Sequence, residues 1–287
     1  MDSIDRKPVS ARIGMVNFIN TAPLYEKWQQ LVKRPDWQVT EAPPTTLNRM
    51  LYNNELDLGF VSSHEYAAHP HLYKLLPGLS ISATGPVGSV FLFSKKDPEL
   101  LAGETVLLSS LSQTSVSLVK IILEEYYQVV PTYLSGTITS DGKLPQDAEG
   151  KDIQAVLAIG DNALRLRESD LFPVKLDLSE VWQKMTGLPF VFAVWAVREE
   201  FCRKDPENIA QIQHELLRCI EEGKRDLHAI CNIVAPRIPM ATNDCFDYLC
   251  GMEYDLDADK LKALEVFFDY LIERGEVSAK ALPVKFF

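Results

Sequence analysis

The side chains best suited to chemistry stand in short polar segments between apolar runs. Asn20 ends the largely apolar run that begins at Ile13, and its uncharged amide can both donate and accept hydrogen bonds. Ser89 follows Gly85 and Gly88, two glycines that let the backbone approach a ligand closely. A helix cap at Asn20 and a surface turn at Ser89 are the simpler structural alternatives.

The segment richest in hydroxyl groups runs from Ser109 to Ser115, with five hydroxyls in seven residues. It lies between an apolar run and a segment of helical periodicity. Hydroxyls beside the free N–H groups of a helix start suit a carboxylate or a phosphate. We therefore expect Ser112, Thr114 and Ser115 to bind an anion. The segment is not a phosphate-binding P-loop, because the Gly-Lys-Ser/Thr pattern is absent from it.

Two further segments place polar side chains at expected strand ends. Ser62 and Ser63 close the apolar run that begins at Leu56, and Ser63 is a candidate binding residue. Asp161 follows the buried-type run Ala155–Ile159, where it either caps the next helix or lines a cleft.

Other sequence features give no sign of a metal site or of familiar catalytic motifs. His69 and His71 flank Pro70, but no carboxylate pattern accompanies them, and a solvated loop is the simpler interpretation. The chain has neither a Gly-x-Ser-x-Gly elbow nor a Gly-x-Gly-x-x-Gly fingerprint. Its five cysteines include no Cys-x-x-Cys pair, which fits reduced thiols in a cytoplasmic protein. The N-terminus does not have the pattern of a secretory signal.

The elements that must position these side chains alternate between short strands and helices, which is typical of an α/β fold. Strands are predicted at Arg12–Ile19, Trp37–Glu41, Leu56–Ser62, Leu79–Ala83, Gly88–Ser94, Thr105–Ser109, Pro131–Leu134, Ala155–Ile159, Val174–Leu178 and Phe190–Val197. Helices are predicted from Pro23, after Thr46, from Ser112, from Asp161 and over Glu180–Met185, and the tail from Pro206 is nearly all helical. The segment 136–150 is predicted to be a polar loop, with no role assigned to it.

One architecture accommodates this order of elements. Two α/β lobes are joined by strands that cross between them near Gly88–Ser94 and Phe190–Val197. The first lobe comprises residues 1–90 and 194–287 and is completed by the C-terminal helices, and the second comprises residues 91–193. We expect the ligand to bind in the cleft between the lobes, where strand ends and helix starts converge.

Charge and composition disfavour some classes of binding partner for the protein and its cleft. The chain has 287 residues and a formal net charge of -11, which disfavours nucleic acid and anionic membranes as partners. Its longest apolar stretch, 189–197, is about half the ~20 residues of a membrane span. No charged residue occurs in Ile13–Leu24, Leu79–Ser94, Val106–Val119 or Gly187–Val197. We therefore expect a neutral cleft that binds its ligand through hydrogen bonds. The sequence carries no signal for an oligomeric state.

Several segments, in this order along the chain, resemble the chorismate dehydratase family, in the menaquinone-biosynthesis branch of the type II periplasmic-binding-protein fold. The residues that carry the resemblance are Val16–Leu24, Asp57–Ser63, Gly88–Val90, Ser112–Val116, Ile159–Leu164 and Thr186–Trp195.

The resemblance implies a reaction as well as a fold. Chorismate would lose water to give 3-[(1-carboxyvinyl)oxy]benzoate, and the gain of aromaticity would supply much of the driving force. The enzyme would be a hydro-lyase of the futalosine route that needs neither a metal nor a redox cofactor.

The resemblance also implies roles for individual residues. Asn20 would be the catalytic polar group that hydrogen-bonds the reacting region. The substrate carboxylates would be bound by Ser89, Thr114 and Ser115 together with backbone N–H groups. The C3 proton would pass to the substrate's own enolpyruvyl carboxylate, with Asp161 as the alternative base.

Three alternatives remain open from the sequence. The chain could bind a small carboxylate without catalysis, although such proteins usually carry an export signal. It could be the sister enzyme 1,4-dihydroxy-6-naphthoate synthase, which needs a histidine in its second lobe, but no histidine occurs between Gly88 and Val197. A metal-dependent enzyme built on His69 and His71 ranks last.

Overall fold

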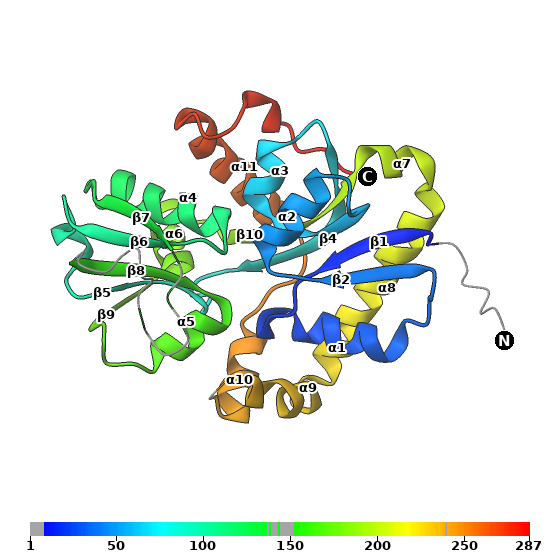
Figure 1. The fold of residues 1–287 in the computed structure, drawn as a ribbon, viewed down its shortest axis with the longest axis horizontal. Coiled ribbons are helices and arrows are strands. Elements are labelled where there is room, and N and C mark those ends of the chain that lie inside the picture. Colours follow the sequence, from blue (N-terminus) through cyan, green and yellow to red (C-terminus); the bar gives the residue numbers. More distant parts are fainter. Residues whose placement is uncertain (1–8, 137, 139–142, 144–151, 239) are drawn as a thin grey trace.

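Two five-stranded sheets, each flanked by helices, form the two lobes of the molecule (Figure 1). The computed structural model describes residues 9–136, 138, 143, 152–238 and 240–287. Most of the predicted polar loop at 136–150 therefore lies outside the described residues. Within the described part of the chain, every helix is too short or too polar to span a bilayer.

The first sheet has the strand order β2-β1-β3-β10-β4. Its strands are β1 (Ala11–Met15), β2 (Trp37–Glu41), β3 (Leu58–Ser62), β4 (Tyr73–Ala83) and β10 (Phe190–Arg198). β1 pairs in parallel with β2 and β3, whereas β10 is antiparallel to β3 and β4. Because parallel strands end at the same edge, the residues after β1 and β3 lie together on the side of the sheet that faces the cleft.

The second sheet repeats this plan with the order β7-β6-β8-β5-β9. Its strands are β5 (Val90–Ser94), β6 (Thr105–Ser109), β7 (Thr132–Gly136), β8 (Ile153–Ile159) and β9 (Val174–Asp177). β6 is parallel to β7 and β8, and β5 is antiparallel to β8 and β9. The polar segments after β6 and β8 therefore reach the same cleft from the opposite lobe.

The chain crosses from the first sheet to the second between Ala83 and Val90, and it returns between Asp177 and Phe190. Asp177 holds the first crossing in place, since its carboxylate accepts hydrogen bonds from the backbone N–H groups of Val87 (3.2 Å) and Gly88 (2.7 Å). The strands predicted near the crossings, Gly88–Ser94 and Phe190–Val197, correspond to β5 and β10, each of which pairs within one sheet, and the chain crosses in the segments that lead into them. The predicted lobe boundaries stay a prediction.

The helices cover the faces of both sheets. Those of eight residues or more are α1 (Ala22–Leu31), α2 (Pro44–Tyr52), α4 (Gln113–Ile121), α5 (Gly160–Arg167), α6 (Leu178–Thr186), α8 (Pro206–Arg225), α9 (Leu227–Val234), α10 (Thr242–Cys250) and α11 (Ala258–Glu273). The shorter ones are α3 (Ser63–Ala68) and α7 (Glu199–Lys204).

The C-terminal helices complete the first lobe, as predicted. α8 packs against α1, and α11 packs against β10. The approach of α8 to α1 requires glycine, because a Cβ atom on Gly223 would stand 2.1 Å from the carbonyl oxygen of Pro23. The predicted α/β fold of two lobes is thus confirmed.

Two strand predictions were wrong in their limits by more than two residues. β1 ends at Met15 rather than Ile19, because the chain turns there and the hydroxyl of Thr21 donates to the carbonyl of Val16 at 2.7 Å. β4 begins at Tyr73 rather than Leu79, since the sheet tolerates a bulge around Pro77-Gly78 on this edge strand.

Candidate functional site

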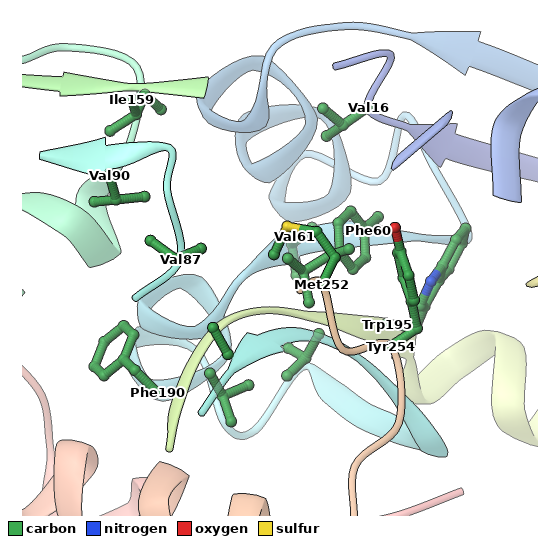
Figure 2. Close-up of a cluster of buried hydrophobic side chains, with 14 of the residues drawn as sticks. Val16, Phe60, Val61, Val87, Val90, Ile159, Phe190, Trp195, Met252 and Tyr254 are labelled. Carbon is green, nitrogen blue, oxygen red and sulfur yellow. The ribbon is translucent and has the colours of Figure 1, made fainter. Parts of the chain in front are cut away.

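A cavity lies between the two lobes, beside the segments that cross between them. Its empty volume is about 600 Å³, a figure that includes space open to solvent. Both lobes contribute to its wall, and Figure 2 shows part of the buried apolar cluster around it. The lining residues are Val16, Phe18, Asn20, Pro44, Phe60, Val61, Ser62, Ile81, Val87, Ser89, Val90, Ser112, Ser115, Ile159, Gly160, Phe192 and Ala193.

The described residues that line the cavity carry no charge, as the sequence predicted. Helix starts supply positive potential instead. Pro44 is the first residue of α2, Ser112 is the N-cap of α4, and Gly160 is the first residue of α5. Each therefore brings the positive, N-terminal end of a helix dipole to the wall, which suits an anion.

Asn20 enters the cavity from a one-turn 3₁₀ helix, Ile19–Thr21, directly before α1. Its side-chain Oδ1 is buried and has no hydrogen-bond partner among the described residues. Its backbone carbonyl, in contrast, accepts a hydrogen bond from the hydroxyl of Tyr254 at 2.9 Å. A buried amide without a partner is costly, so the geometry fits a group that is satisfied by a ligand.

Serine hydroxyls around the cavity share one arrangement: each oxygen already accepts a hydrogen bond from another protein group. Ser89 Oγ accepts from the Tyr248 hydroxyl at 2.9 Å, and Ser115 Oγ accepts from Ser112 at 3.0 Å. The Oγ of Ser62 accepts from the side-chain amide of Asn48, also at 3.0 Å. These contacts leave the hydroxyl protons of the three serines free to point into the cavity, which makes it rich in donors.

Four of the predicted site residues meet at the cavity, and three others lie behind its wall. Asn20, Ser89, Ser112 and Ser115 are lining residues, as given above. Ser63 donates to the carbonyl of Val191 at 2.6 Å, and the Thr114 hydroxyl accepts from the backbone N–H of His64 at 3.0 Å. Asp161 accepts from the backbone N–H of Ile19 at 3.3 Å and so connects the two lobes. The roles predicted for these three residues stay predictions.

The sequence analysis named Ser62 at a strand end without selecting it as a site residue, and it missed Tyr248 and Tyr254. Ser62 takes the place at the cavity that was predicted for Ser63, because it ends β3 and its hydroxyl caps α3 by accepting from Glu65 N at 3.2 Å. The spacing Ser-x-x-Glu of a capping box could have identified it. No local pattern points to the two tyrosines, which belong to the C-terminal part of the chain and donate hydrogen bonds to the cavity residues Ser89 and Asn20.

Titratable groups surround the cavity at a distance. Burial raises the pKa of Asp161, which the Ile19 N–H group partly offsets. Burial also raises the pKa of Asp177, although its four backbone N–H donors lower that pKa in part. Burial lowers the pKa of His64. None of these three residues lines the cavity, so a ligand meets uncharged groups first.

No group of three or more His, Cys, Asp or Glu side chains in the described residues could hold a metal ion. His69 packs against the rings of Tyr52 and Tyr73, with its Nε2 3.8 Å from the carboxylate of Glu65. This environment is that of a packed side chain. All five cysteines are free thiols.

Comparisons with known proteins identify relatives over nearly the whole chain. A family model described as menaquinone biosynthesis matches residues 11–273. A chorismate dehydratase from Thermus thermophilus is 30% identical over 279 residues, which cover 90% of this chain and 94% of that protein. A chorismate dehydratase from Campylobacter jejuni is 28% identical over 220 residues, or 71% of this chain and 78% of the relative.

Solved structures show the same fold at lower identity. Protein AF1704 from Archaeoglobus fulgidus matches with a TM-score of 0.71 and 17% identity, covering 93% of this chain and 98% of that one. The periplasmic aliphatic sulphonate binding protein SsuA from Escherichia coli matches with a TM-score of 0.63 and 15% identity, covering 96% and 90%. These likenesses confirm the predicted periplasmic-binding-protein fold.

Proposed function

The chain belongs to the menaquinone biosynthesis family, and on that basis we propose that it is a chorismate dehydratase. The reaction would be a carbon–oxygen lyase step. The C3 proton and the C4 hydroxyl of chorismate leave together as water, and the ring gains its third double bond to give 3-[(1-carboxyvinyl)oxy]benzoate. Electrons balance without an oxidant or a reductant, so the proposed step calls for no redox cofactor.

The observation that carries the proposal is a neutral, donor-rich cavity with an unpaired amide. Chorismate is a dianion, and the cavity offers hydroxyl protons from Ser62, Ser89 and Ser115 beside the helix starts at Ser112 and Gly160. The substrate carboxylates can exchange their hydrogen bonds with water for hydrogen bonds with these donors. The helix starts favour the negative charge, so the site needs no buried cation. The apolar remainder of the wall suits the ring and the enolpyruvyl methylene group.

Asn20 is the proposed catalytic residue. Its amide would hydrogen-bond the reacting region and stabilise the charge that develops as the C3 proton is removed. The cavity wall contains no carboxylate or imidazole among its described residues. This supports the substrate's own enolpyruvyl carboxylate as the base, with the protein fixing its conformation.

Asp161 is the alternative base. It lies just behind Gly160, but its carboxylate is engaged with the backbone of Ile19 and holds the lobes together. We therefore expect Asp161→Asn to keep turnover within about threefold, since asparagine can still accept that hydrogen bond. A loss of more than about a hundredfold in kcat, the usual contribution of a general base, would assign the proton transfer to Asp161.

The direct test is to incubate the purified protein with chorismate and follow an aromatic enolpyruvyl product by absorbance and mass spectrometry. The Asn20→Ala variant serves as the matched control for spontaneous breakdown of chorismate. Product formation that requires Asn20 supports the proposal. Tight binding of chorismate without product would instead indicate a binding protein, and conversion of a different substrate to 1,4-dihydroxy-6-naphthoate would indicate the sister enzyme.

We also propose that the enzyme acts in the cytoplasm. The five free cysteines support this, because exported proteins more often pair their thiols.

A further inference from the structure

Two buried tyrosines contact cavity residues from the C-terminal part of the chain, which contributes none of the lining residues described above. Tyr248 lies in α10, and Tyr254 lies in the segment between α10 and α11. Their side chains are almost fully buried, with exposed fractions of 8% and 3%. Each donates one hydrogen bond to a proposed site residue, at 2.9 Å in both cases.

Tyr254 acts on the backbone that carries Asn20. Its hydroxyl donates to the carbonyl oxygen of Asn20, within the single turn Ile19–Thr21. Figure 2 shows its side chain within the cluster of buried hydrophobic residues. A single 3₁₀ turn has few hydrogen bonds of its own, so an external donor to this carbonyl fixes the peptide plane and with it the direction of the Asn20 side chain.

Tyr248 acts on the hydroxyl of Ser89. Its ring packs against Gly88, where a Cβ atom would stand 3.3 Å from Cδ2 of the tyrosine. Its hydroxyl donates to Ser89 Oγ. Because the Ser89 oxygen is occupied as an acceptor from the protein side, its proton is directed to the cavity side.

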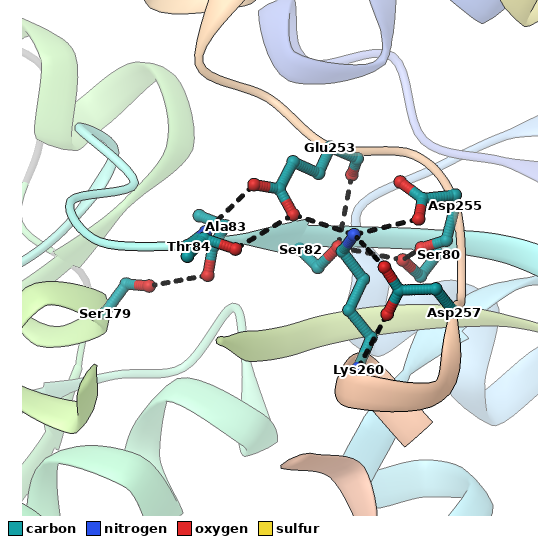
Figure 3. A network of polar contacts seen from close by, with 9 residues as sticks. All are labelled: Ser80, Ser82, Ala83, Thr84, Ser179, Glu253, Asp255, Asp257 and Lys260. Atoms are coloured by element: carbon teal, nitrogen blue, oxygen red, sulfur yellow. Dashed lines mark hydrogen bonds and ion pairs between the residues drawn. The ribbon is translucent and has the colours of Figure 1, made fainter. Parts of the chain in front are cut away.

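The segment that carries Tyr254 is anchored on both sides (Figure 3). Glu253 pairs with Ser82 on β4 through two backbone hydrogen bonds of 3.0 and 3.1 Å, and the Tyr254 carbonyl accepts from Ser80 N at 2.8 Å. Lys260 then joins the carboxylates of Glu253 and Asp255, both at 2.9 Å. The tyrosine therefore stands on an extension of the first sheet and not on a free loop.

Burial raises the pKa of both tyrosines above the ordinary value. Their hydroxyls consequently stay protonated and remain donors throughout the pH range in which an enzyme works.

We propose that Tyr254 and Tyr248 are positioning residues for the dehydration, Tyr254 acting through Asn20 and Tyr248 acting through Ser89. This inference rests on the proposed function. It assigns a role in the reaction to the C-terminal part of the chain. Tyr254 holds the catalytic amide toward the reacting carbon, and Tyr248 keeps a serine proton available to a substrate carboxylate.

The two roles predict different kinetic changes. Tyr254→Phe should lower kcat about tenfold with KM nearly unchanged, because the amide is needed in the transition state. Tyr248→Phe should raise KM about fivefold with a smaller change in kcat, because Ser89 then binds the carboxylate less well in both states. Tyr66→Phe is the matched control. Tyr66 is equally buried and accepts from Lys285 N at 2.7 Å, but it lies away from the cavity lining, so kcat and KM should not move.

Double variants show whether each tyrosine acts through its partner. Adding Tyr248→Phe to Ser89→Ala should change KM no further, and adding Tyr254→Phe to Asn20→Ala should change kcat no further. Fully additive effects, or equal kinetic changes in Tyr66→Phe, would overturn the proposal and leave a structural role only.

A failure of the proposed function is recognised separately, because the wild-type protein would then form no product from chorismate. In that case the affinity for chorismate, measured by calorimetry, decides the positioning roles. The role of Tyr248 is supported if Tyr248→Phe weakens the affinity of the wild-type protein for chorismate but does not change the affinity of the Ser89→Ala variant. Unchanged affinity, or no binding to the wild-type protein, overturns it.

Discussion

The cavity and the cluster around Lys260 are both buried polar regions of the first lobe and its border, yet they are built in opposite ways. Lys260 is only 7% exposed, and its ammonium group meets three carboxylates, from Glu253 (2.9 Å), Asp255 (2.9 Å) and Asp257 (3.4 Å) (Figure 3). Burial lowers its pKa, but the hydrogen bonds and charges of these carboxylates outweigh that and keep the ammonium group charged. Every charge in the cluster has a partner within the protein.

The cavity contains no charge in its described wall, and its polar groups are incompletely paired. The Oδ1 of Asn20 has no partner among the described residues. The hydroxyls of Ser62, Ser89 and Ser115 accept hydrogen bonds from other protein groups and donate none to the described residues. This difference distinguishes polar groups that stabilise the fold from polar groups that bind a ligand. A matched cluster contributes to stability, whereas leftover hydrogen-bonding capacity in a cavity contributes to ligand binding.

The largest effect should come from removing the unpaired amide. Asn20→Ala should lower kcat by about 10³-fold, the usual loss for a group that stabilises developing charge. It should change the free energy of unfolding by less than about 1 kcal/mol, because no protein partner loses a hydrogen bond to Oδ1. Steady-state kinetics with chorismate and urea denaturation measure the two quantities.

Asn17→Ala is the control for that variant. Asn17 is an exposed neighbour whose amide donates to Glu41 at 2.9 Å, outside the cavity. Its kcat should stay at the wild-type value. An Asn20→Ala protein that turned over normally but unfolded easily would reverse the proposed distinction between the two regions.

Glu65 is an intermediate case, a buried carboxyl with one side-chain donor, Tyr73 at 3.0 Å. Burial raises its pKa to about 7, from 4.5 in the unfolded chain. Between these values the folded protein binds a proton that the unfolded chain lacks, so stability falls as pH rises from 4.5 to 7 and then levels off. The loss should be about 3 kcal/mol at most.

Glu65→Gln should remove that slope, since the amide keeps an acceptor for Tyr73 and cannot ionise. The free energy of unfolding, measured by denaturant titration from acid to mildly alkaline pH, should exceed that of the wild type increasingly from pH 4.5 to 7 and by a constant amount above pH 7. Glu273→Gln, on an exposed site of α11, should retain the wild-type profile. An unchanged slope in Glu65→Gln would show that this carboxyl is already well paired.

Removing the centre of the matched cluster should affect stability more than turnover. Lys260→Met should lower the free energy of unfolding by about 2 kcal/mol, less than for a fully buried pair because Asp255 and Asp257 are half exposed and regain water. kcat should fall less than tenfold at temperatures where the variant is folded. Thermal denaturation and steady-state kinetics provide the comparison.

The same substitution at an exposed ion pair provides the control. Lys184 lies 2.7 Å from Glu180 on α6, and both side chains are exposed. Lys184→Met should lower the free energy of unfolding far less than Lys260→Met does, because water already solvates and screens an exposed pair. If Lys260→Met abolished turnover at full stability, the cluster would belong to the functional region.

The sequence predicted the features that local signals determine. Ser112 was placed correctly at a helix start because a polar run follows a buried strand, and the helix predicted to end at Met185 ends at Thr186, just before Gly187 with φ 73°. Ser63 was selected although its neighbour Ser62 lines the cavity, because one position reverses the face to which a strand side chain points and the sequence does not define that register. The neutral cavity was predictable because whole segments lack charged residues.

Contacts between distant parts of the chain were not predictable from one sequence. Tyr254 and Asn20 are 234 positions apart, and Tyr248 and Ser89 are 159 positions apart. Both contacts exist only because the C-terminal helices return to the first lobe and bring α10 beside the crossing segment. Helical periodicity predicts which residues are buried, but it does not tell which buried tyrosine will find a carbonyl group and which a serine.

The smallest expected effect concerns salt, and it tests the neutrality of the cavity directly. A wall without cations should bind chorismate through short hydrogen bonds, which salt screens weakly, while the net charge of -11 repels the dianion at long range. KM should therefore change less than about twofold, and in the downward direction, between about 50 and 500 mM salt. Two salts with different anions separate screening from competition by the anion itself. A tenfold rise in KM with both salts would mean that an arginine or lysine reaches the substrate, and the contrast between a neutral cavity and a charged, matched cluster would no longer hold.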